Sequence, residues 1–183
     1  MFVAVLLAGC GGSSSSGGTK AANPNAKETL PPGDIPDNQA FVAYAPSGAS
    51  YSLKVPEGWS RRAQGGVVTF SANLNRIQVQ ERKAAGTLSA GAVKATLPKL
   101  AKSIKGFSSA QVSTVSRPAG HAVRIAYLAT APTDAVTGRS GVDEFEQYLF
   151  VRNGRELVLT LSAPKGSDNV DPWRVVTTSV RWK

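Results

Sequence analysis

The chain has 183 residues, with 21 Lys and Arg against 12 Asp and Glu, and a net charge of +9. It contains one Cys and one His, which excludes an intramolecular disulfide and most zinc or Cys/His chemistry. No apolar run of membrane-spanning length follows residue 10, and residues 40–183 are enough for a single folded domain.

The positive charge is concentrated in one part of the chain. Residues 50–130 hold twelve Lys and Arg against only Glu57 and Glu81. Such a surface fits anionic lipid head groups, an acidic envelope polymer or an acidic protein partner. The alternative is that the charge only keeps the domain soluble. We expect no nucleic-acid partner, because no basic motif interleaved with aromatic residues is present.

The N-terminus has the pattern of a lipidation signal. An apolar segment, residues 2–7, is followed by Ala8, Gly9 and the single Cys10, and this resembles the lipobox of a bacterial lipoprotein. The segment is too short to span a bilayer, and the two small residues suit a processing site. We therefore expect a signal peptide over residues 1–9 and a lipid on Cys10. The alternatives are an ordinary signal peptide, or a first strand with a buried Cys. No basic residue precedes Phe2, so we expect the translation start to lie upstream of Met1.

Residues 10–39 have the composition of a tether. A Gly/Ser tract over residues 11–18 is followed by a segment containing four prolines, which favours disorder passing into extended chain. As a coil, this stretch would hold the folded domain about 30 Å from the anchor. We therefore expect the domain to begin at residue 40.

Strands are expected first in the folded part. Residues 41–44 and 51–55 flank the turn signal Ser47-Gly48 and predict a hairpin. Two more strands are expected at 67–70 and 76–81, the second from its alternation of apolar and polar residues. An apolar stripe then predicts a helix over 93–104 that ends at Gly106, with Pro98 marking a kink or a late start.

Two hairpins and a helix complete the expected order. The first hairpin joins 111–116 to 122–130, and the second joins 142–152 to 156–162 through Asn153-Gly154, a strong hairpin signal. Alternating leucines at 157, 159 and 161 predict the core face of the last strand. A helical stripe over 170–180 follows, with Asp171 expected as the N-cap before Pro172.

This order, with Tyr51-Ser52-Leu53-Lys54-Val55-Pro56-Glu57-Gly58-Trp59 at its front, resembles the PsbP-like superfamily. The segment from Ala163 to Trp173 is similar to the end of LpqN-type lipoproteins of actinobacteria in that group. The Ala- and Arg-rich composition is typical of a GC-rich actinobacterial genome. The resemblance implies an α+β fold, with an antiparallel sheet between helices in an α/β/α sandwich. The resemblance also implies a role in binding or assembly, without a cofactor. It assigns no functional residue to this sequence.

Candidate sites are few. Asp143, Glu144 and Glu146 form an acidic cluster that could serve acid/base chemistry or hold calcium, although Arg124 on a neighbouring strand could instead pair with it. Trp59 with Arg61 and Arg62 could bind an anion or a sugar, or Trp59 could simply anchor the core. The remaining candidates are Lys94 and Lys102 on the basic helix and the turn residue His121, which has no predicted catalytic partner.

Three functional hypotheses follow. The first is a lipid-anchored extracytoplasmic binding or assembly module without catalytic activity. The second is a carrier of a small apolar or lipid ligand, which requires an apolar pocket of about 300 Å³ or more. The third is a hydrolase using Glu144 or Glu146, which requires a cleft beside those carboxylates.

Overall fold

The computed structural model describes residues 31–133, 138 and 140–183. Its elements, in chain order, are β1 (Phe41–Tyr44), β2 (Tyr51–Pro56), β3 (Ser60–Gln64), β4 (Val67–Ala72), β5 (Asn75–Lys83), α1 (Ala90–Ser103), β6 (Ser108–Arg117), β7 (Gly120–Thr130), β8 (Val142–Arg152), β9 (Arg155–Pro164), α2 (Val170–Thr178) and β10 (Arg181–Trp182). In this part of the chain, neither helix is long and apolar enough to cross a bilayer.

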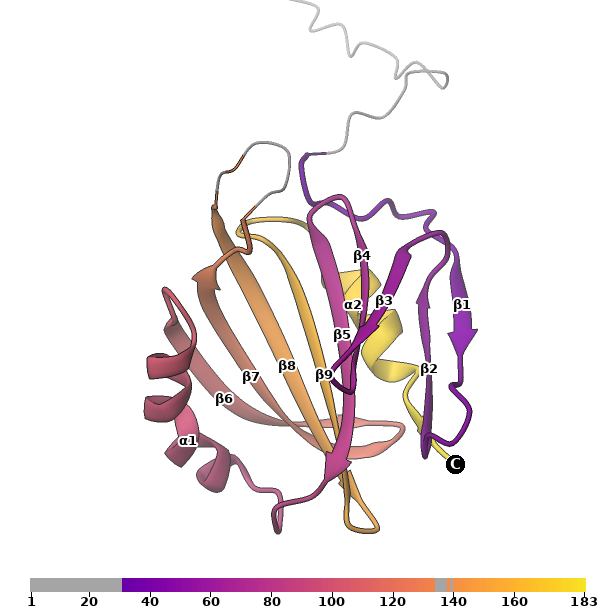
Figure 1. The fold of residues 1–183 in the computed structure, drawn as a ribbon, viewed down its shortest axis with the longest axis vertical. Coiled ribbons are helices and arrows are strands. Elements are labelled where there is room, and N and C mark those ends of the chain that lie inside the picture. Colours follow the sequence, from indigo (N-terminus) through magenta and orange to yellow (C-terminus); the bar gives the residue numbers. More distant parts are fainter. Residues whose placement is uncertain (1–30, 134–137, 139) are drawn as a thin grey trace, which may run out of the picture.

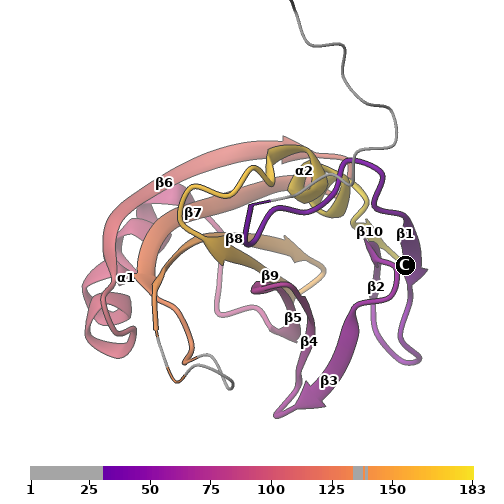
Figure 2. The ribbon, with the colours of Figure 1, turned by 90° about the horizontal axis from the view of Figure 1, so that it is seen from above.

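A seven-stranded antiparallel sheet forms the centre of the domain, in the order β3-β4-β5-β9-β8-β7-β6. Helix α1 lies against one face of this sheet (Figures 1 and 2). Helix α2 and a three-stranded sheet, β1-β2-β10, lie against the other face. The expected α+β class, with an antiparallel sheet between helices, is confirmed.

The alternation of side chains along the strands divides the core between these two faces. Leu157, Leu159 and Leu161 of β9 are fully buried on the face covered by α2 and the small sheet. On the other face, Ile125 of β7 packs in the cluster that includes Val93 of α1. The core face predicted for the last strand is therefore confirmed.

Helix α1 begins at Ala90, eight residues before Pro98. The Ser89 hydroxyl accepts a hydrogen bond from the backbone N–H of Ala92 (3.1 Å), so the helix is capped at its first turn. Pro98 lies inside the helix, and the helix ends at Ser103. Of the two expectations for Pro98, the late start is wrong, because the capped N-terminus fixes the beginning of the helix.

The predicted N-cap of α2 is also wrong. The helix starts at Val170, Asn169 occupies the N-cap position, and Asp171 in the first turn forms an ion pair with Arg174 (2.9 Å). Pro172 is tolerated because the first N–H groups of a helix have no partner within the helix. The Asn169 side chain makes no capping bond, because it is engaged with the N-terminal segment.

The segment before β1 belongs to the fold. The Asn169 amide donates to the Gly33 carbonyl (2.8 Å), and its oxygen accepts from the Ile35 N–H (2.8 Å). Ile35 is buried in the core. Gly33 has φ +92°, and a Cβ there would lie 2.5 Å from Pro164 Cδ, so the site admits only glycine. The folded part therefore starts before residue 40, the boundary expected from composition.

Candidate functional site

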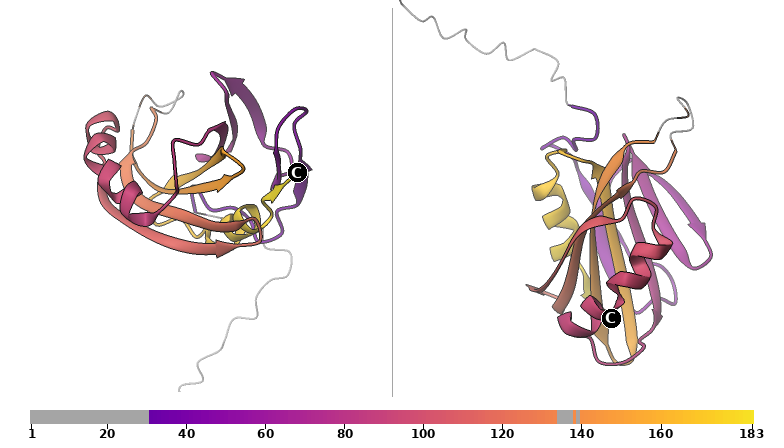
Figure 3. Two further views of the ribbon diagram at one scale, coloured as in Figure 1. Left: turned by 90° about the horizontal axis from the view of Figure 1, so that it is seen from below. Right: turned by 90° about the vertical axis from the view of Figure 1, so that its left-hand side faces the viewer.

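Helix α2 is too short to cover the sheet beneath it. Nine helical residues extend about 14 Å, whereas the eleven residues of β7 or β8 extend about 36 Å. The uncovered sheet beside α2 forms a cleft of about 670 Å³ over β6, β7 and β8. Figure 3 shows α2 on the opposite side of the sheet from α1. We call this hollow the α2 cleft.

The walls of the α2 cleft are mainly apolar. The sheet contributes Val115, Ala126 and Leu128, and α2 contributes Val170 and Trp173. Trp173 is buried, whereas Val170 is 73% exposed at the rim. Exposed aliphatic surface beside a buried aromatic ring favours apolar groups of a ligand.

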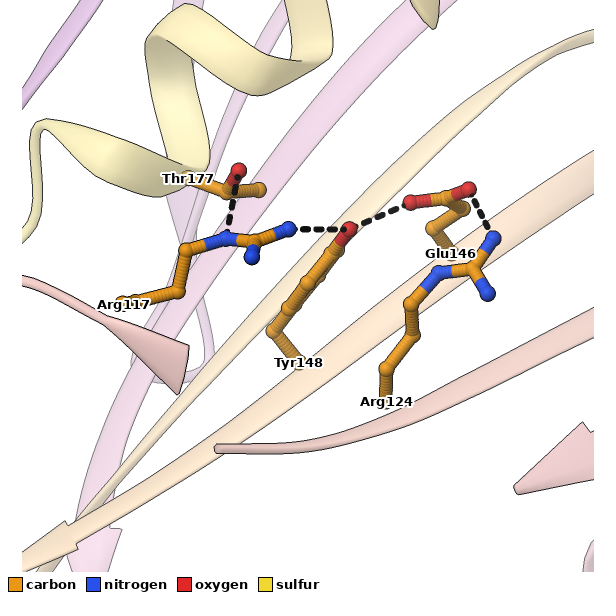
Figure 4. A network of polar contacts seen from close by, with 5 residues as sticks. All are labelled: Arg117, Arg124, Glu146, Tyr148 and Thr177. Carbon is orange, nitrogen blue, oxygen red and sulfur yellow. Dashed lines mark hydrogen bonds and ion pairs between the residues drawn. The ribbon is translucent and has the colours of Figure 1, made fainter. Parts of the chain in front are cut away.

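The floor of the cleft is a connected polar network (Figure 4). Glu146 of β8 forms an ion pair with Arg124 of β7 through one carboxylate oxygen, and accepts a hydrogen bond from the Tyr148 hydroxyl (2.6 Å) through the other. Arg117 of β6 donates to the Tyr148 hydroxyl (3.4 Å) and, through Nε, to Thr177 Oγ1 of α2 (3.3 Å). Three strands and one helix therefore meet at a single chain of polar contacts.

This network stabilises the charged form of Arg124. Its hydrogen bond with Glu146 raises the pKa of the guanidinium above its usual value, against the opposing effect of burial. Burial raises the pKa of the Tyr148 hydroxyl, and the hydrogen bond to Glu146 raises it further, so Tyr148 stays protonated as a donor. The floor of the cleft therefore holds two donors, Arg124 and Tyr148, in fixed positions, and both oxygens of the Glu146 carboxylate are already bonded to them.

Glu144 lies on the same face as Glu146, two residues nearer the start of β8. Burial raises the pKa of the Glu144 carboxyl, and a backbone hydrogen bond from Gly166 opposes this change. The expected pairing of the acidic cluster with Arg124 is confirmed for Glu146.

The third acidic residue is on the opposite face of the sheet. Asp143 is buried, with its carboxylate 3.7 Å from Arg76, and its Oδ2 has no hydrogen-bond partner among the described residues. Alternation along β8 separates Asp143 from Glu144 and Glu146, so the three carboxylates do not converge. Within residues 31–133, 138 and 140–183, no group of three or more His, Cys, Asp or Glu could hold a metal ion.

The structure does not bring Arg61 and Arg62 together. The Arg61 guanidinium lies over the Tyr44 ring, 5.2 Å from its centroid. Arg62 pairs with Thr69 in the ladder, so its side chain projects to the other face of β3. Trp59 packs against the core cluster, as the alternative interpretation expected.

The other candidates lie outside the α2 cleft. His121 is exposed, with Nδ1 3.3 Å from the Ser116 hydroxyl. Lys94 and Lys102 are exposed on α1, and neither forms an ion pair within the described part of the chain. Cys10 falls outside the described residues.

Among the residues that give the cleft its chemistry, sequence reasoning did not single out Arg117, Tyr148 or Trp173 as site residues. Strand alternation could have placed Tyr148 on the face of Glu146, because the two residues are two apart. The turns fix which strands are neighbours, but they do not fix where α2 lies on the sheet. No sequence signal could therefore have predicted that Arg117 of β6 contacts Thr177 of α2. That contact depends on where α2 docks.

No protein-family profile and no curated protein matches the sequence. Solved structures do match. The cyanobacterial PsbP (CyanoP) of Synechocystis sp. PCC 6803 is 15% identical, with 79% of this chain and 94% of that one covered and a TM-score of 0.51. LpqN of Mycobacterium tuberculosis, described as involved in cell envelope biogenesis, is 17% identical, with 79% and 85% covered and a TM-score of 0.38.

A third similar structure is a protein of Bacteroides thetaiotaomicron VPI-5482, which is 14% identical with a TM-score of 0.48. The match covers 77% of this chain and 48% of that one, so this chain spans about half its length. Identities this low show the fold alone, and the likeness to CyanoP shows it over most of both chains. The chain has a PsbP-like fold.

Proposed function

We propose that this chain is an extracytoplasmic binding module, lipid-anchored at Cys10, that carries a small amphipathic ligand in the α2 cleft and catalyses no reaction. The observation that carries the proposal is the α2 cleft itself. Its volume of about 670 Å³ falls within the usual range of ligand pockets, and its apolar walls stand over a small set of fixed polar groups. This combination favours a carrier over a module that works only through an outer surface.

The geometry of the carboxylates argues against a hydrolase. Both oxygens of Glu146 are engaged, one by Arg124 and the other by Tyr148, so Glu146 is not free to act as a base. Glu144 would then have to work without a second free carboxylate. We therefore expect Glu144→Gln to leave ligand binding, and every other function of the chain, intact.

The carrier proposal is tested by native mass spectrometry of the full chain purified from its own host. We expect an additional mass that is lost on denaturation. Ala126→Trp, which fills the α2 cleft from the middle of β7, should abolish the bound mass. The matched control is Gln78→Trp, because Gln78 is exposed on the opposite face of the sheet. A bare mass for the unmodified chain, or equal occupancy in both variants, would overturn the proposal.

The anchor proposal rests on the sequence pattern at Cys10, and the fold gives it a geometric consequence. Gly33 contacts Asn169 just before α2, so the N-terminal end of the described chain lies at the end of the domain where α2 begins (Figure 1). The rim residue Val170 is at the same end. In the native host, Cys10→Ser should move the protein from the membrane fraction to the soluble fraction, and persistence in the membrane fraction would contradict lipidation.

We also propose that the basic side of α1 contacts an anionic component of the envelope. Lys94, Lys99 and Lys102 are all exposed on this helix, and each Lys near an anionic surface contributes about 1 kcal/mol. The chain with Cys10→Ser should bind phosphatidylglycerol vesicles in preference to phosphatidylcholine vesicles, and added salt should weaken binding. Replacing Lys94 and Lys102 with Gln should reduce binding more than replacing Lys54 and Lys83, which are exposed elsewhere. Equal effects of the two double variants would contradict a role for α1.

A further inference from the structure

We infer that the ligand of the α2 cleft is a single-chain amphiphile with an anionic head, a carboxylate or a phosphate monoester, and that Arg117 binds this head. The inference rests on the proposed function, because it assigns a ligand class to the same cleft. The observations that lead to it are the position of Arg117, the charges around it and the apolar residues in the rest of the cleft.

Arg117 is held in place before any ligand arrives. Its Nε donates to Thr177 Oγ1 (3.3 Å), one Nη donates to the Ser116 carbonyl (2.9 Å), and the other donates to the Tyr148 hydroxyl (3.4 Å). The guanidinium carbon lies 5.3 Å from the centroid of the Tyr148 ring. A guanidinium has five N–H donors, so donors remain for a ligand at a group that needs little further ordering.

The charge of Arg117 is not neutralised. Among the described residues, no carboxylate forms an ion pair with it, whereas Arg124 is paired with Glu146, and Arg174 with Asp171. The remaining acid of the cleft, Glu144, is four residues from Tyr148, roughly 13 Å along β8. The floor around Arg117 therefore has a net positive charge and favours an anion.

The fork of a guanidinium matches the oxygens of carboxylates and phosphates equally well. Beyond the Arg124–Glu146 ion pair, Ala126 and Leu128 continue the cleft along β7, beside Glu146 and Glu144 in the register, toward the rim where Val170 is exposed. A ligand with its head at Arg117 would thus lay its chain along these residues. A free inorganic anion would gain nothing from this apolar path.

The test compares ligands that share one chain length. Dodecanoate, dodecyl phosphate and dodecanol are titrated by calorimetry, below their aggregation concentrations, into the full chain with Cys10→Ser. Inorganic phosphate serves as the head without the chain. We expect both anionic amphiphiles to bind about tenfold to a hundredfold more tightly than dodecanol, the gain of a charge-assisted hydrogen bond. Inorganic phosphate alone should not bind measurably.

Arg117→Gln should remove this preference and leave dodecanol binding unchanged. Arg152→Gln is the matched control, because Arg152 is exposed at the end of β8, away from the cleft, and loses the same charge. Thermal midpoints of both variants check that each is folded. If the anions and dodecanol bind equally and Arg117→Gln changes neither, the inference is overturned and the cleft remains a carrier site. If no amphiphile binds, or Ala126→Trp binds all of them normally, the proposed function falls and this inference falls with it.

Discussion

The contact between the N-terminal segment and α2 leads to a quantitative prediction about stability. Asn169 is 1% exposed and makes three hydrogen bonds, to Gly33 (2.8 Å), Ile35 (2.8 Å) and Asn75 (2.9 Å). A hydrogen bond of this kind contributes about 1 kcal/mol net. Asn169→Ala should therefore lower the free energy of unfolding by roughly 3 kcal/mol.

Removing residues 31–39 tests the same contact from the other side. The deletion removes the burial of Ile35, about 2 kcal/mol, and takes away two of the three partners of Asn169. In the chain that starts at residue 40, Asn169→Ala should cost only about 1 kcal/mol, because Asn75 alone remains. The two changes should therefore show a coupling energy of about 2 kcal/mol in a double-mutant cycle.

The cycle is measured by urea unfolding of residues 31–183 and 40–183, each with Asn or Ala at position 169, and with a common denaturant slope as the check for two-state behaviour. Asn38→Ala, at an exposed position in the same segment, is the control and should cost less than about 0.5 kcal/mol. A coupling energy below about 0.5 kcal/mol would refute the reasoning, because it would mean that residues 31–39 contribute nothing through Asn169.

Three other substitutions have expected outcomes. Burial raises the pKa of the Asp143 carboxyl, so folding favours its protonated form. The protonated carboxyl therefore stabilises the fold below the ordinary pKa of 3.8, and this stabilisation is lost as the pH rises through the higher pKa of the folded state. Asp143→Asn should thus raise the urea midpoint at pH 7, and the gain should vanish below pH 4. Tyr148→Phe, which breaks the link between Arg117 and Glu146, should cost about 1–2 kcal/mol and weaken binding of dodecanoate but not of dodecanol. Gly33→Ala should lower the thermal midpoint by more than Gly48→Ala, since a Cβ meets Pro164 at the first site and open space at the second.

The parts of the fold that local chemistry determines could be predicted from the sequence. The hairpin at Asn153-Gly154 formed as expected, with φ of 49° and 73°, because a tight turn between twisted strands needs two residues with positive φ. The alternating leucines of β9 identified the buried face for a similar reason, since the strand period is fixed at two.

Strand β3 could not be predicted in this way. All five of its residues, Ser60–Gln64, are exposed, and none gives an alternating apolar signal. The strand exists because the turn at Gly65 and Gly66 returns the chain along β4, which supplies its hydrogen bonds. Its two arginines are typical of an edge strand that discourages pairing with other chains.

Of the candidate site, only the Arg124–Glu146 pair was predicted. Arg124 and Glu146 could be paired from the sequence because neighbouring strands and their faces follow from the turns. Arg117 meets Thr177 only after α2 docks, and the docking depends on Asn169 and Gly33, residues that are 136 positions apart. Contacts of this kind have no local signature.

Helix α2 connects the N-terminal segment to the proposed head-group site, and this connection can be tested. Asn169 before the helix binds the Ile35 N–H, and Thr177 in its last turn holds Arg117, about 12 Å away along the axis. A ligand that engages Arg117 and packs on Val170 and Trp173 binds the docked helix and not the undocked one.

At a concentration a hundred times its dissociation constant, this ligand would disfavour undocking of α2 by about 2.7 kcal/mol. Saturating dodecanoate should therefore slow hydrogen exchange of the Ile35 amide about a hundredfold, whereas amides of β3, at the edge of the large sheet opposite β6, should be unaffected. Unchanged exchange at Ile35 with the cleft occupied would show that ligand binding and helix docking are independent.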